Sequence, residues 1–149
     1  MKKQLPTVLV AEDDADDRLL IRNAFEENAR PLNLRFVNDG NALLAYLRNK
    51  NRIFRDENPR PSILLLDLNM PDPDGRLILR ELKSDPELKN IPTLVFTGAT
   101  TPDEVLRAYQ SGVNSFIAKP NSFAELVTIV KGIEHYWFDL SEIPGKPTL

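Results

Sequence analysis

Four apolar runs of this sequence each end in a polar side chain of a type that takes part in chemistry. A polar group placed where a buried strand meets a loop loses hydration and needs a compensating partner. Such perturbed groups are candidates for a functional site. If the runs are parallel strands, their carboxyl ends meet at one edge of a sheet. The groups are Glu12 and Asp13 after residues 7–11, Asp67 after residues 63–66, Thr97 after residues 93–96 and Lys119 after residues 115–118.

Three of these groups are carboxylates, Glu12, Asp13 and Asp67. Carboxylates held close together repel one another and raise each other's pKa values, so the cluster is reasonable only if it shares a cation. The chain has no cysteine and a single histidine, His135, which argues against thiolate and multi-histidine metal centres. Oxygen ligands alone favour a hard ion such as Mg²⁺, which keeps part of its hydration shell.

A metal ion beside a carboxylate, an ammonium group and a hydroxyl suits phosphoryl transfer. Mg²⁺ and Lys119 would neutralise charge on the phosphoryl oxygens while Asp67 attacks phosphorus, and the product would be an acyl phosphate. For any one of these residues, an ordinary polar strand end explains the sequence about equally well. The agreement of four strand ends favours the chemical interpretation.

The segments that must position these groups alternate between strand-like and helix-like hydrophobic periods. This alternation predicts the α/β class, with a parallel sheet that helices cover on both faces. Polar residues 48–61 interrupt it, and we expect them to form a solvated loop, with a partner-docking segment as the alternative. Strands are predicted at about residues 7–12, 34–38, 62–67, 92–97 and 113–118.

Helical periodicity places the first helix at about residues 15–29, with Leu19, Leu20, Ala24 and Phe25 on one side. A second helix is marked by Leu43, Leu44 and Leu47. A third is predicted at about residues 76–84 and ends before Pro86, because proline disfavours helix at and before its own position.

The last two helices begin at capping boxes, in which a hydroxyl binds a free amide and a glutamate binds back. The pairs are Thr101 with Glu104 and Ser122 with Glu125. Gly112 is expected to end the fourth helix. The fifth is expected to run to about residue 138.

The composition limits the remaining possibilities. The 149 residues suit a single compact domain. The net charge of -3 comes from interspersed charges, so neither nucleic acid nor an anionic membrane is favoured as a partner. No apolar run approaches the roughly 20 residues that span a bilayer, and the start of the chain lacks the apolar stretch of a signal peptide. We therefore expect a soluble, cytoplasmic protein.

Taken together, these motifs resemble the receiver domain of bacterial two-component response regulators. The resemblance covers about residues 6–138 and leaves residues 139–149 as a C-terminal extension. It implies a flavodoxin-like, doubly wound (βα)5 fold with a five-stranded parallel sheet in the order 2-1-3-4-5. The matching motifs are Glu12-Asp13, Asp67 through Gly75, Thr97-Gly98 and Lys119-Pro120.

The resemblance also implies a role for each matching residue. Asp67 would accept a phosphoryl group from a histidine kinase or phosphorelay protein, while Thr97 and Lys119 would contact that group. The Lys119-Pro120 bond is expected to be cis. A switch would couple Thr97 to the aromatic Phe116 on the fifth strand. Mg²⁺ would be bound by Glu12 through a water molecule, by Asp13 and Asp67 directly, and by the Asn69 carbonyl.

Weaker features resemble the stand-alone response regulators that are paired with bacterial phytochromes. These features are the long loop before the third strand, the aromatic end of the fifth helix and the proline-containing tail. They imply a phytochrome kinase as a partner. They also imply a homodimer formed through the fourth helix, fifth strand, fifth helix and C-terminal extension. Tyr136, Trp137 and Phe138 cannot all face one side of a helix, so some should be exposed.

Two other functions are compatible with parts of this pattern. A phosphorylation-independent pseudo-receiver would bind a partner without using the carboxylates. A phosphatase with an aspartyl nucleophile would usually carry a second acid two residues after it, where this chain has Asn69. We therefore expect no enzyme activity beyond self-phosphorylation and slow autodephosphorylation.

Overall fold

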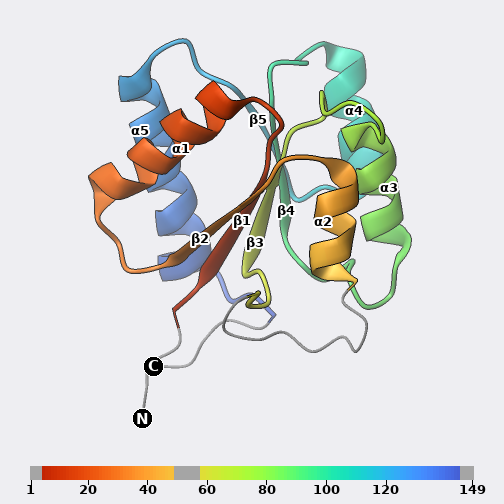
Figure 1. Cartoon of the computed structure of the whole chain (residues 1–149), viewed down its shortest axis with the longest axis horizontal. Coiled ribbons are helices and arrows are strands. Elements are labelled where there is room, and N and C mark those ends of the chain that lie inside the picture. Colours follow the sequence, from red (N-terminus) through yellow and green to blue (C-terminus); the bar gives the residue numbers. More distant parts are fainter. Residues whose placement is uncertain (1–4, 49–57, 145–149) are drawn as a thin grey trace.

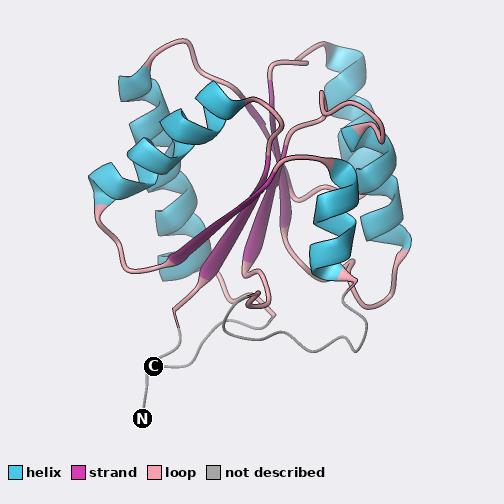
Figure 2. Cartoon of the chain, in the orientation of Figure 1, coloured by secondary structure: helices cyan, strands magenta, loops and turns pink. Residues whose placement is uncertain are grey.

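The computed structural model describes residues 5–48 and 58–144 as one parallel sheet between two layers of helices (Figure 1). The five strands are arranged in the order β2-β1-β3-β4-β5, so the predicted topology is confirmed. Helices α1 and α5 cover one face of the sheet and α2, α3 and α4 cover the other (Figures 1 and 2). The predicted alternative of a docking segment at residues 48–61 falls largely outside the described residues.

The inner strands are buried throughout, which agrees with continuous apolar runs in a sheet covered on both faces. Neighbouring strands pair in parallel, with Ala11 opposite Leu66 and Thr97 opposite Ala118. This register brings the carboxyl ends of the strands to one edge. The strands are β1 Thr7–Ala11, β2 Asn33–Val37, β3 Ile63–Leu66, β4 Thr93–Thr97 and β5 Ser115–Ala118.

The helices lie close to their predicted positions. The hydroxyls of Thr101 and Ser122 accept hydrogen bonds from the amides three residues later, as the capping boxes predict. Gly112 follows α4 with a φ of 101°, a conformation that glycine adopts readily. The helices are α1 Ala15–Asn28, α2 Gly40–Leu47, α3 Gly75–Ser84, α4 Pro102–Gln110 and α5 Phe123–Glu134.

The predicted inner face of α1 is partly wrong. Leu19 and Leu20 are 56% and 43% exposed, whereas Ile21, Ala24 and Phe25 are buried against the sheet and α5. Positions 21, 24 and 25 form an apolar stripe of helical spacing. Leu20 lies at the edge of that stripe and Leu19 lies on nearly the opposite side of the helix, so both remain exposed.

The fifth helix also ends differently from the prediction. Regular α-helix stops at Glu134, and a π-helical segment, η1 (His135–Leu140), carries the chain onward. The aromatic residues of η1 fan out, since Tyr136 is exposed, Trp137 half-buried and Phe138 buried. The expectation that some of them are exposed is confirmed.

Lys83 links the end of α3 to the start of β4. Its Nζ donates to the carbonyl oxygens of Lys89 and Ile91 and to Oδ1 of Asn114. Burial lowers the pKa of Lys83 to about 8. Because the folded pKa lies below that of a lysine in the unfolded chain, the unfolded state holds more protons between pH 8 and about 10.5.

The contribution of Lys83 to the free energy of unfolding should therefore rise with pH across that window. We expect the stability of wild type relative to Lys83→Met to increase between pH 8 and 10.5 and to stay constant between pH 6 and 7.5. Urea unfolding of both proteins at several pH values measures this difference. Parallel pH profiles would contradict the assignment.

Candidate functional site

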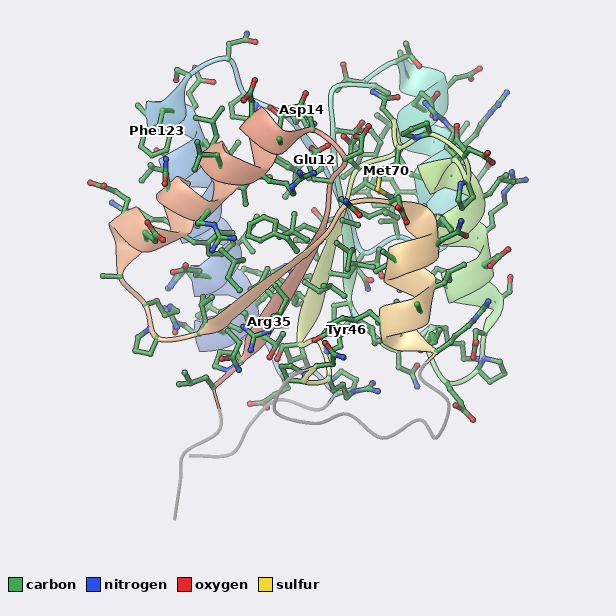
Figure 3. All side chains as sticks on the ribbon, viewed as in Figure 1. Glu12, Asp14, Arg35, Tyr46, Met70 and Phe123 are labelled. Carbon is green, nitrogen blue, oxygen red and sulfur yellow. The ribbon has the colours of Figure 1, made fainter. Side chains whose placement is uncertain are left out.

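The structure brings the predicted strand-end residues together at one edge of the sheet. Glu12, Asp67, Thr97 and Lys119 follow or end β1, β3, β4 and β5. In the view of Figure 3, Glu12 and Met70, a residue of the loop between β3 and α3, both lie toward the same end of the sheet. The shared edge follows from the parallel pairing of the strands.

Asp67 lies at the centre of this group and is 4% exposed. Its Oδ1 accepts hydrogen bonds of 2.9 Å from the Asn69 amide and from the Thr97 hydroxyl. Its Oδ2 accepts a hydrogen bond of 2.9 Å from Lys119. Burial raises the pKa of Asp67. Hydrogen bonds with the Asn69 amide, Glu12 and Lys119 lower it by more, so the pKa of Asp67 is below its ordinary value. Asp67 is therefore held ionised.

The Lys119 ammonium is shared among three carboxylates. Nζ lies 2.5 Å from Glu12, 2.7 Å from Asp17 and 2.9 Å from Asp67. Burial lowers the pKa of Lys119, but bonds to these carboxylates outweigh that effect and raise it above its ordinary value. Lys119 is thus a permanent cation aimed at Asp67.

The predicted cis bond between Lys119 and Pro120 is wrong, since the cis bond in the described residues joins Asp72 and Pro73. The amide of Lys119 continues the pairing of β4 and β5 by donating to the Thr97 carbonyl at 2.9 Å. This pairing delivers the side chain to the carboxylates with a trans bond.

Glu12 shows that the cluster carries more negative charge than Lys119 balances. The side chain is buried, and Oε1 has the lysine ion pair but no hydrogen bond of acceptable geometry. Burial raises the pKa of Glu12 to about 8, with a further rise from Asp67 and an opposing effect from Lys119. A second cation beside Glu12 would lower the free-energy cost of ionising its buried carboxyl group.

Glu12, Asp13 and Asp67 form a candidate site for a divalent metal. In the part of the chain that the structure describes, these are the carboxylates with ligand atoms within 4.8 Å of one another. Asp13 is exposed and open to water, whereas the other two are buried. An all-oxygen donor set with one open side suits a hard, partly hydrated ion.

We expect Asp13→Asn to weaken binding of a divalent ion about tenfold, because it removes one charged oxygen ligand. Saturating Mg²⁺ should therefore raise the melting temperature of wild type more than that of the variant. Asp16→Asn is the matched control, since Asp16 lies one residue into α1 and outside the cluster. Equal shifts in wild type and Asp13→Asn would remove Asp13 from the site.

Two further residues of the site come from α1 and were not predicted from the sequence. Asp17 is the third carboxylate on Lys119, and Arg18 donates from Nη1 to the Glu12 carbonyl at 2.8 Å. Both are near the start of a helix that directly follows the acidic pair. Their position in the first turn could have indicated them, because that turn must lie above the carboxyl end of β1.

Gly75, the last residue of the predicted motif that begins at Asp67, is the first residue of α3. A methyl group added at Gly75 would lie 2.3 Å from the Asp67 carbonyl oxygen and 2.7 Å from the Leu68 Cα. The first turn of α3 therefore packs directly onto the backbone that carries Asp67.

The predicted switch residues lie on the same face of the sheet. Phe116 pairs with Val95, two residues before Thr97, and residues two apart on a strand share a face. Thr97 is fully buried, and Phe116 is half-buried against the core beneath α3 and α4. The Phe116 amide donates to the Tyr109 hydroxyl of α4 at 3.2 Å.

The family of the response regulator receiver domain matches residues 8–131 of this chain. The response regulator Rcp1 of Synechocystis is 34% identical over 138 residues, covering 93% of this chain and 92% of that protein. Its Mn²⁺-bound crystal structure superposes with a TM-score of 0.82 over 94% of this chain and 99% of Rcp1.

Two further solved structures are similar along nearly their whole length. One is the phosphorylated cyanobacterial phytochrome response regulator RcpA, at 36% identity and a TM-score of 0.84. The match covers 95% of this chain and 99% of RcpA. The other is RPA3017, a response regulator in red light signalling of R. palustris, at 35% identity and a TM-score of 0.87. The match covers 95% of this chain and 100% of RPA3017.

Proposed function

The chain belongs to the response regulator receiver domain family, and we propose from this premise that it accepts a phosphoryl group on Asp67 from a histidine kinase or phosphorelay protein. The observation that carries the assignment to Asp67 is its buried, ionised carboxylate, which has the Thr97 hydroxyl on one oxygen and the Lys119 ammonium on the other. We place the receiver domain at residues 6–138 and the extension at residues 139–149.

In the transfer step, an Asp67 oxygen forms a bond to phosphorus while the bond from phosphorus to the donor's histidine nitrogen breaks. The donor imidazole leaves with the electron pair of that bond. Lys119 is placed to neutralise charge on the transferred group, and Thr97 to exchange its bond to Asp67 for one to a phosphoryl oxygen. Hydrolysis by water later breaks the bond between Asp67 and phosphorus and restores the carboxylate.

We assign Mg²⁺ to the acidic cluster, held by Asp13 and Asp67, by the Asn69 carbonyl and by Glu12 through water. The three carboxylates fit a divalent ion in charge and spacing. When bound, the ion would supply further neutralisation of the phosphoryl oxygens. The Mn²⁺-bound structure of Rcp1 supports the choice of a divalent ion.

The donor would approach over α1 and the start of α5. Leu20 and Phe123 are exposed there, and both line a hollow that reaches Lys119. Exposed apolar side chains beside a reactive carboxylate fit a protein phosphodonor, since apolar patches commonly mark interaction sites. A phytochrome kinase is the donor we propose, because RcpA and RPA3017 act in phytochrome and red light signalling.

We further propose a homodimer through α4, β5, α5 and the C-terminal extension. Exposed apolar side chains occur on α4 and on η1, which follows α5, and a groove is lined by Ile117 of β5, Ile129 of α5 and Trp137 of η1. The exposed residues are Leu106, Tyr109, Tyr136 and Leu140. A monomer in sedimentation with and without beryllofluoride, a phosphate mimic, would overturn this assignment.

The switch proposal couples phosphorylation to this surface through Thr97 and Phe116. When Thr97 turns toward the phosphoryl group, Phe116 would move into the vacated space and reposition α4, to which its amide is bonded through Tyr109. Phe116→Ala should uncouple partner binding from phosphorylation. Phosphorylation-dependent association that survives this substitution would remove the aromatic step.

Binding of beryllofluoride with Mg²⁺ tests the proposed function without a cognate kinase. We expect one equivalent to bind to wild type and none to Asp67→Ala, as measured by calorimetry. Failure of wild type to bind would favour the pseudo-receiver, which acts independently of phosphate.

A further inference from the structure

Arg76, the second residue of α3, joins the loop after Asp67 to α4. Its Nε and Nη2 donate to the Glu104 carboxylate of α4 at 2.7 to 2.9 Å. Its Nη1 donates to the Leu68 carbonyl oxygen at 3.1 Å. Nη2 also lies 3.5 Å from Oδ1 of Asn69. One guanidinium group therefore contacts both residues that follow Asp67.

Arg76 is itself fixed in place. Nη1 lies 3.1 Å from both carboxylate oxygens of Asp74, the residue that caps α3. The Glu104 bond raises the pKa of Arg76 further above its ordinary value, and Arg76 in turn lowers the pKa of Glu104. The close packing of Gly75 on the Asp67 and Leu68 backbone leaves α3 little freedom to shift.

We propose that Arg76 is a positioning residue for the chemistry at Asp67. It holds the Leu68–Asn69 backbone where the Asn69 carbonyl can bind the metal, and it passes any displacement of that backbone to α4 through Glu104. This inference rests on the proposed function, since the position of Asn69 matters only if its carbonyl binds a metal beside the phosphoryl group.

The shape of arginine explains why this residue suits the position. Its three nitrogens donate in a fixed planar fork, so the carboxylate of α4 and the carbonyl of the loop are bound at once. A lysine ammonium is compact and flexible and would serve one of these two acceptors at a time. The ion pair with Glu104 is half-buried and so is less screened than a surface pair.

Two variants separate the two parts of the proposal. Arg76→Ala removes the contacts to the loop and to α4, whereas Glu104→Ala removes the contact to α4 alone. We expect calorimetry to show that Arg76→Ala weakens Mg²⁺ binding about tenfold, as loss of a residue that supports a metal ligand does. Glu104→Ala should leave the affinity within about twofold of wild type.

The matched control is Arg80→Ala, which removes a positive charge from the same helix. Arg80 is exposed and one turn further along α3. Loss of a nearby positive charge by itself would strengthen binding of a cation. Mg²⁺ binding that is weaker in Arg76→Ala but not in Arg80→Ala would therefore show that Arg76 positions the Leu68–Asn69 backbone. Arg76→Lys provides a second variant that keeps the charge, and it should weaken binding by an intermediate factor.

The link to α4 has its own readout. In wild type, Mg²⁺ and beryllofluoride should shift the amide NMR signals of residues 102–110, and these shifts should shrink in both Arg76→Ala and Glu104→Ala. Unchanged Mg²⁺ affinity in both Arg76 variants, or α4 shifts equal to those of wild type, would overturn the inference. If wild type binds Mg²⁺ as expected but takes no phosphoryl group or mimic, the proposed function fails instead.

Discussion

Replacing Lys119 with methionine is expected to slow phosphorylation of Asp67 by about 100-fold or more, the usual effect of removing one group that stabilises charge in a transition state. Lys119 contacts Asp67 directly and is the cation that Glu12, Asp17 and Asp67 share. Methionine keeps most of the length and the unbranched apolar stem of the side chain but supplies no charge. The rate can be followed by intact mass with a small phosphodonor at saturating Mg²⁺.

The same substitution should reduce stability, because it leaves Glu12 and Asp67 buried without their common cation. Breaking a buried ion pair by removing one partner costs about 3–5 kcal/mol. Mg²⁺ should restore part of that loss in Lys119→Met, since it supplies positive charge to the same carboxylates. Lys119→Arg is the comparison variant, because it keeps the charge and should retain most of the stability. A phosphorylation rate in Lys119→Met within a few fold of wild type would remove Lys119 from the mechanism.

Gly75→Ala is expected to cost about 3 kcal/mol of folding free energy, at the upper end for overpacking. The added methyl group would meet the Asp67 carbonyl oxygen and the Leu68 backbone at 2.3 to 2.9 Å. Backbone atoms cannot rotate away as a flexible side chain does, so α3 and the loop must separate. For a chain of this size the melting temperature should fall by roughly 10 °C.

Phosphorylation of Gly75→Ala should also be impaired below the melting transition, because the methyl group displaces the residue that accepts the phosphoryl group. Gly132→Ala is the matched control. A methyl group at Gly132 meets nothing within 4 Å, and alanine is favoured over glycine inside a helix such as α5. A Gly75→Ala protein as stable and as active as Gly132→Ala would show that α3 does not fix the position of Asp67.

The parts of the fold that the sequence could predict depend on periodicity and on chain order. Buried strands such as β3 are continuous apolar runs, and parallel pairing requires their ends to share an edge. Capping residues such as Thr101 and Ser122 mark helix starts because their hydroxyls bind amides only three residues away. Local interactions of this kind are fully contained in a short stretch of sequence.

The parts that were missed depend on packing between distant segments. Leu19 and Leu20 look like core residues by composition, but α1 turns Ile21, Ala24 and Phe25 toward the sheet and α5 instead. Asp17 meets Lys119 across 102 residues, and Arg76 meets Glu104 across 28. Arg76 looks like an ordinary charge on a helix surface, and the only local indication for Asp17 is its place in the first turn of α1.

The end of α5 was also not predicted, because contacts between distant residues hold the segment that follows it. Periodicity predicted one regular helix to about residue 138, but the chain widens into a π-helix at His135. Arg30 at the end of α1 bonds to Glu134 and, through two nitrogens, to Asp139. These contacts hold the segment against α1. They join residues more than 100 positions apart, which a helical pattern cannot reveal.

The central claim is that Asp67 accepts a phosphoryl group in a reaction that needs the acidic metal site. Intact mass tests it most directly, after wild type and Asp67→Asn are incubated with a small phosphodonor, each with and without Mg²⁺. We predict that one phosphoryl group adds to wild type in the presence of Mg²⁺ and that no adduct forms in the other three samples. An adduct of equal yield on Asp67→Asn, or no adduct on wild type with Mg²⁺, would contradict the claim.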